Sequence, residues 1–159
     1  MVAAEETEND ALKYCLVGTR KDLVSWGHEY LRCLSGQIGK EFEKKIEQDE
    51  STDELIGLVD QIIPEFIYHN EEPEAVDLLI EVEKLPKVVE FTNKNNYSRV
   101  CNYLLSCSDY AADTEEMQAT FKTAFDVFKK FKKYPDALRV AQKMNNMELI
   151  SEIMSSCED

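Results

Sequence analysis

The segment His28-Glu29-Tyr30-Leu31-Arg32 contains the first residues whose types and spacing could do chemistry. A zinc protease of the His-Glu-x-x-His type places two histidines four residues apart on one helix face, with the glutamate as general base. Arg32 stands where the second histidine would be, so the pattern is incomplete. His69 is the only other histidine, and no Cys-x-x-Cys pair is present. We therefore predict no catalytic, cofactor-binding or metal-binding residue, and we interpret His28 as a structural histidine.

Thiol chemistry is the second possibility, because cysteines stand at positions 15, 33, 101, 107 and 157. A nucleophilic thiol needs a base and an orienting group in contact with it. Cys33 follows His28 by five residues, which places it on another part of a helix surface, and Cys101 and Cys107 have no histidine nearby in sequence. Buried free cysteines usually behave as small hydrophobes. An odd count without a disulfide pattern suits a reducing compartment, so we predict a location in the cytoplasm and nucleus.

The charge balance excludes several classes of partner. The chain has 32 Asp and Glu against 18 Lys and Arg, for a net charge of −14. Nucleic-acid phosphates and anionic membrane surfaces would be repelled by this charge, so neither is an expected partner. The sequence contains no Gly-rich phosphate loop. It also has no apolar run approaching the roughly 20 residues that span a bilayer.

One basic cluster stands out, formed by Lys129, Lys130, Lys132 and Lys133. It follows phenylalanines at 121, 125 and 128 and surrounds the one at 131, which is the composition of a membrane-lying or partner-binding helix. The same segment begins with acidic residues at 113, 115 and 116. An acidic start and a basic end also complement the helix macrodipole, with the phenylalanines facing a core. Both interpretations remain open from the sequence.

Apolar residues recur every three or four positions along most of the chain, which predicts amphipathic helices and no strand. The expected helices span 10–17, 19–48, 51–69, 73–82, 85–91, 95–108, 113–131, 137–144 and 149–154. Pro64 should kink or restart its helix. The apolar faces are expected to include Ile46 and Met154.

These helices predict an all-α fold, arranged as an irregular α-solenoid of antiparallel helix hairpins. We expect a flexible tail over residues 1–9 and a single helical domain over 10–157. No polar capping repeat closes the predicted solenoid, which indicates a fragment of a longer chain.

Trp26 and Gly27 stand together inside the second predicted helix. Glycine within a helix costs about 1 kcal/mol relative to alanine. We therefore expect a neighbouring helix to approach Gly27 closely, so that a leucine there would overpack the contact.

An ordered set of short segments also occurs in a known family. They are Ala11-Leu-Lys-Tyr14, Leu16-Val-Gly18, Ser25-Trp-Gly-His-Glu-Tyr30, His69-Asn70, Glu74-Ala75, Asp77-Leu-Leu79, Val100-Cys101, Tyr103-Leu104, Ser106-Cys107, Ala137-Leu-Arg139 and Asn146-Met-Glu-Leu149. On these segments the chain resembles the large scaffold subunit of the proteasome regulatory particle base, the family of 26S proteasome non-ATPase regulatory subunit 2. The likeness covers the helical region upstream of that family's repeat toroid.

The resemblance implies a non-catalytic scaffold in ubiquitin-dependent protein degradation. It implies contacts with proteasome ATPase-ring subunits and other regulatory-particle subunits. Ubiquitin, the ubiquitin-like domains of shuttle receptors and a deubiquitinase bind the family's toroid, whose Gly/Ala-rich repeats are absent here. No ubiquitin-binding residue is therefore assigned to this chain.

Two other functions stay open from the residues alone. One is a free-standing helical adaptor of another cytosolic multiprotein assembly. A pull-down from cell lysate would then recover a complex unrelated to the proteasome. The other is a small thiol or metal enzyme, which would show stoichiometric zinc or a thiol of lowered pKa in a cleft.

Overall fold

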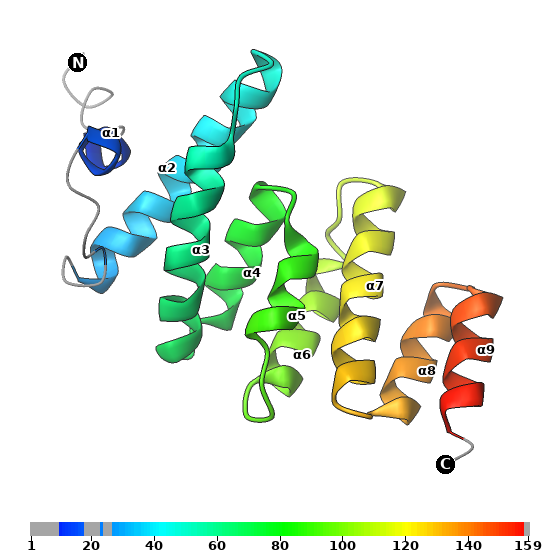
Figure 1. Ribbon diagram of the computed structural model, residues 1–159. Coiled ribbons are helices and arrows are strands. Elements are labelled where there is room, and N and C mark those ends of the chain that lie inside the picture. The colour runs from blue at the N-terminus through cyan, green and yellow to red at the C-terminus, as the bar shows by residue number, and fades with distance from the viewer. Residues whose placement is uncertain (1–9, 18–22, 24–26, 158–159) are drawn as a thin grey trace. The chain divides into compact units, whose positions relative to one another are not determined.

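The computed structural model describes residues 10–17, 23 and 27–157 (Figure 1). Over these ranges the chain forms nine α-helices and no β-strand, which confirms the all-α prediction. The chain divides into two compact units, 1–84 and 85–159, and each is described by itself. The solenoid arrangement and the single domain over 10–157 remain predictions. The expected tail over 1–9, the Thr19 helix start and Trp26 lie outside the described residues.

The N-terminal unit contains four helices. They are α1 (Asp10–Val17), α2 (His28–Glu47), α3 (Asp53–Tyr68) and α4 (Glu72–Glu81). Helix α2 packs against all three others, and α3 also packs against α4. The buried stripe of α2 is Leu31, Leu34, Ile38 and Phe42. The last three follow the predicted spacing, whereas Leu31 and not the expected Tyr30 is the buried residue of the first turn. Ile46 is 52% exposed, which corrects its predicted burial: the buried stripe of α2 ends one turn earlier, at Phe42.

Two side chains attach α1 to α2. The buried Gln37 accepts a hydrogen bond from the backbone N–H of Leu12 at 2.7 Å. The hydroxyl of Tyr30 donates to the carbonyl of Ala11 at 3.0 Å. Burial raises the pKa of Tyr30 above its ordinary value, so the phenol stays protonated and remains a donor.

Helix α3 runs unbroken through Pro64, so the expected restart at that residue does not occur. Proline removes the bond that its N–H would have donated to the carbonyl four residues earlier. Pro64 faces solvent, where water can reach the backbone. The opposite face of α3 buries six apolar side chains, and that packing holds the helix together across the proline.

The close helix approach expected at Gly27 occurs at a different glycine. Gly27 precedes α2 as its N-cap with φ 89° and ψ 158°, and a Cβ there would meet nothing within 4 Å. This backbone region is open essentially to glycine alone, so conformation and not packing explains the residue. Gly39 is the packed glycine: a Cβ there would lie 3.3 Å from the Cβ of Glu81 on α4, and closer to its carboxyl group.

The C-terminal unit begins with a short turn and continues as five helices. The turn is the 3-10 helix η2 (Leu85–Lys87), and the five helices are α5 (Val88–Phe91), α6 (Tyr97–Cys107), α7 (Thr114–Lys130), α8 (Tyr134–Lys143) and α9 (Met147–Ser156). Helix α7 packs against α5, α6 and α8, and α8 packs against α9. Asp113 caps α7 by accepting from the N–H of Glu116, and Asn146 caps α9, so both helix starts follow from local sequence.

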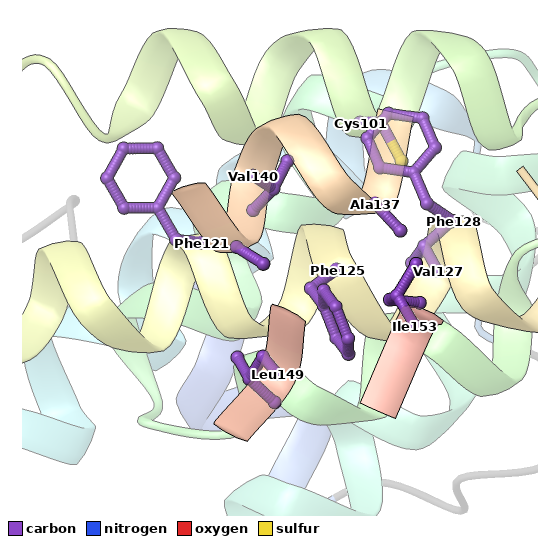
Figure 2. Close-up of a cluster of buried hydrophobic side chains, with 10 residues drawn as sticks. Cys101, Phe121, Phe125, Val127, Phe128, Ala137, Val140, Leu149 and Ile153 are labelled. Atoms are coloured by element: carbon purple, nitrogen blue, oxygen red, sulfur yellow. The ribbon is translucent and has the colours of Figure 1, made fainter. Parts of the chain in front are cut away.

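The phenylalanine stripe of α7 forms the core of this unit, as the macrodipole interpretation predicted (Figure 2). Phe121, Phe125 and Phe128 pack with buried residues of α6, α8 and α9. Ala137 and Ala141 of α8 are fully buried, where their small side chains let helices approach closely. Met154 is 57% exposed and not buried as expected, because Leu149 and Ile153 already occupy the inward face of α9.

Replacement of Gly39 by leucine should lower the free energy of unfolding by about 1–3 kcal/mol, because the new side chain must displace Glu81 and separate α2 from α4. Urea unfolding followed by circular dichroism measures the change. Gly36→Leu is the matched control, since this glycine lies on α2 with nothing within 4 Å of a Cβ. Equal stability of the two variants would contradict the close approach at Gly39.

Candidate functional site

His28 and Arg32, the two ends of the incomplete zinc motif, take part in one ion-pair cluster of the N-terminal unit. Both lie on the first turns of α2 and face the start of α4. The imidazole Nε2 of His28 lies at ion-pair distance from the carboxylate of Glu71. Arg32 pairs with Glu74, and its guanidinium is 3.7 Å from Glu71. Arg32 therefore connects two helices and is not a failed metal ligand.

The hydrogen bond from Arg32 to Glu74, together with the charge of Glu71, raises the pKa of the arginine. The arginine therefore stays charged, and it neutralises acidic groups in the first turn of α4.

The fold brings the only two histidines of the chain together, which sequence spacing did not indicate. His69 is the C-cap of α3. Its ring centroid lies 5.5 Å from that of His28, and His28 also meets the ring of Phe66 edge-on at 6.2 Å. No group of three or more His, Cys, Asp or Glu in the described ranges is placed to hold a metal ion.

Cys101 belongs to the phenylalanine core and has the environment of an inert thiol. It is fully buried, and its sulfur lies 3.9 Å from the carbonyl of Ala124. Burial, with a smaller effect from the charge of Asp136, raises the pKa of the Cys101 thiol to about 12. The reactive thiolate is therefore suppressed at neutral pH.

We expect iodoacetamide at pH 8 to alkylate Cys33 and Cys157 in the folded protein and to leave Cys101 unmodified. The first two are exposed, whereas Cys101 is buried with a pKa about four units above that pH. Peptide mass spectrometry over a time course gives the relative rates, and the same reaction in urea shows that Cys101 is reactive once unfolded. Native labelling of Cys101 as fast as Cys33 would contradict its burial.

Three lysines of the basic cluster have partners within their own unit. Lys129 pairs with Glu152 of α9. Lys130 donates to the carbonyls of Val89 at 2.5 Å and Thr92 at 2.9 Å. Lys133 lies over the ring of Tyr97 at 5.6 Å. The cluster thus binds the end of α7 to α5, α6 and α9, which favours a structural role over a basic docking patch.

Lys130→Met should destabilise the protein by about 1 kcal/mol, because the carbonyls at the end of α5 lose a charged donor. Hydrogen exchange should also become faster in α5. Urea unfolding and exchange mass spectrometry measure both effects. Lys132→Met, in the same cluster, should stay within about 0.5 kcal/mol of the parent. Equal effects of the two substitutions would show that the Lys130 contacts contribute nothing.

The acidic charge is concentrated in one half of the chain. Residues 1–84 contain 21 Asp and Glu against 8 Lys and Arg, whereas residues 85–159 contain 11 against 10. The N-terminal unit therefore has a net charge of −13 and the C-terminal unit of −1. The sequence could have shown this division, but the whole-chain average concealed it. The negative charge that would attract a basic protein partner therefore lies almost entirely in the N-terminal unit.

Large apolar side chains remain exposed on both units. Tyr68 on α3 is 78% exposed, and Met147 and Met154 on α9 are 72% and 57% exposed. Tyr110, before α7, is 89% exposed. None of the helices in the part of the chain that the structure describes is long and apolar enough to cross a bilayer. The exposed aromatic and methionine side chains are the candidate binding surfaces of this molecule.

Over the described residues the fold is all-α, and His28, Arg32, Cys101 and Lys130 take part in ion pairs, packing or hydrogen bonds within their own units. The family model described as the RPN1 N-terminal domain matches residues 1–159. The chain therefore belongs to the RPN1 N-terminal domain family.

Similar proteins include several proteasome subunits. The chain is 46% identical over 152 residues to 26S proteasome non-ATPase regulatory subunit 2 of Dictyostelium discoideum, which covers 96% of the chain and 17% of that relative. It is 37% identical over 159 residues to homolog A of this subunit in Arabidopsis thaliana, and 38% identical over 159 residues to regulatory subunit rpn1 of Schizosaccharomyces pombe. Both matches cover 100% of the chain and 18% of the relative. The chain thus spans less than a fifth of the length of these relatives.

Proposed function

We propose that this chain is a non-catalytic scaffold module of the proteasome regulatory particle base. The observation that carries the proposal is the family match over the whole chain, joined to relatives that are named as proteasome regulatory subunits. The described contacts support it, because His28, Arg32, Cys101 and Lys130 all have structural partners. A helical fold whose N-terminal unit is strongly acidic is suited to protein contacts in ubiquitin-dependent protein degradation.

The proposed partners are ATPase-ring subunits and other subunits of the regulatory particle, in the cytoplasm and nucleus. Shuttle receptors with ubiquitin-like domains and a deubiquitinase would bind the larger subunit through its toroid, which is not in this sequence. The exposed Tyr68 and the charge of the N-terminal unit support direct contact with another protein.

The second candidate is a helical adaptor of another cytosolic assembly. The same exposed side chains on α3 and α9 support it, since they indicate a protein partner without identifying one. It differs from the first proposal in what the chain binds and not in its chemistry.

Co-purification of the tagged chain with recombinant subunits of the regulatory particle base tests the proposal. We expect co-elution in size-exclusion chromatography, with stoichiometry given by mass photometry. A charge-matched acidic protein of similar size is the control for nonspecific attraction. Failure of the chain to bind the assembled base or any of its subunits would reject the proteasomal role. One equivalent of bound zinc in the purified chain would instead support a metal enzyme.

A further inference from the structure

The outer face of α3 combines residues that are unusual on an exposed helix. Gly57, Asp60, Gln61, Pro64 and Tyr68 are all exposed and lie opposite the buried stripe of the same helix. Gly57 and Pro64 are seven residues apart, so helical geometry places them two turns apart along one line. Tyr68 lies one further turn along that line. We call these five residues the α3 outer face.

Neither Gly57 nor Pro64 stabilises α3 or packs closely against another helix of the unit. Both residue types weaken the interior of a helix, glycine through backbone entropy and proline through a missing hydrogen bond. A Cβ at Gly57 would meet nothing within 4 Å, so no neighbouring helix requires its small size. Gly39 on α2, by contrast, lies directly against Glu81. Gln61, the next residue along this line, donates from its side chain to the carbonyl of Gly57 at 3.1 Å, which holds that side chain against the helix. Gly57 and Pro64 therefore form a low strip on α3 that Gln61 crosses and that no neighbouring helix covers at Gly57.

Tyr68 provides an apolar anchor at the end of this strip. It is 78% exposed, and its ring meets that of His69 edge-on at a centroid distance of 5.2 Å. A tyrosine braced in this way loses little conformational freedom when a partner covers it. Exposed, preorganised aromatic residues of this kind often dominate the energy of protein interfaces.

The acidic charge of α3 favours a partner with basic residues. The helix contains Asp53, Glu54, Asp60 and Glu65 and no Lys or Arg. It belongs to the unit whose net charge is −13. A partner with basic residues on both sides of an apolar stripe would complement this surface.

We propose that the α3 outer face docks a basic amphipathic helix from another protein. The strip at Gly57 and Pro64 lets the partner's backbone approach closely, and Tyr68 packs against its apolar stripe. Lysines and arginines beside that stripe face the carboxylates of α3. This inference deepens the proposed scaffold role, on which it rests, by naming the surface and the chemistry of its partner.

The test uses a synthetic amphipathic peptide of about three heptads, with leucine on one face and lysine and arginine beside it. A second peptide carries glutamate in place of every basic residue. Fluorescence anisotropy measures the affinity of the 159-residue chain for each peptide, and NMR chemical shifts map the contact. We expect binding of the basic peptide only, with affinity that falls as salt rises.

Two substitutions should weaken this binding about tenfold or more, the effect expected at an interface anchor. Gly57→Leu fills the strip, and Tyr68→Ala removes the anchor. Both positions are exposed, so circular dichroism and thermal unfolding should show intact folding. Gly36→Leu and Tyr110→Ala are matched controls at other exposed positions and should bind like the parent.

Equal binding by all variants, shifts that map away from α3, or no binding of the basic peptide would overturn the proposal. The base-subunit experiment separates this failure from failure of the proposed function. If the parent and the α3 variants bind the base subunits equally well, the scaffold role is supported and the α3 outer face is not the binding surface. Peptide binding through α3 without binding to base subunits would keep the surface and reject the proteasomal role.

Discussion

Burial of one apolar stripe on each helix is the interaction on which the rest of this structure depends. In the C-terminal unit that stripe is the row of Phe121, Phe125 and Phe128, against which α6 and α8 pack. Each fully buried phenylalanine contributes roughly 1.5–3 kcal/mol from surface removed from water. Native proteins are stable by only about 5–15 kcal/mol, so these few rings hold α7 in place and, through it, its neighbouring helices.

Packing of the stripes determines what the polar residues can do. Once α2 and α4 lie together, His28 and Arg32 reach Glu71 and Glu74 and connect the two helices. Once α7 lies against α5, Lys130 reaches two backbone carbonyls. Exposed ion pairs each contribute little, typically about 0–1 kcal/mol, so they refine the arrangement that apolar burial establishes.

Charge and packing have separate roles in this molecule. The C-terminal unit is nearly neutral and has its phenylalanine core, whereas the N-terminal unit contains almost all of the excess acidic charge. Such charge affects association more than folding. Under the proposed scaffold role, this separation would let the surface of the N-terminal unit be adapted to a partner without changing the core that positions it.

The sequence by itself determined most of the helices, the cap at Asp113, the phenylalanine stripe and the family resemblance. These features depend on the spacing of residue types along the chain, because the helical repeat fixes which residues share a face. Only the tertiary structure decided that Gly39 and not Gly27 is the close contact, that the two histidines meet, and that Ile46 and Met154 stay exposed. Periodicity shows which side of a helix is apolar, but the positions that a neighbour covers depend on where the other helices pack and end.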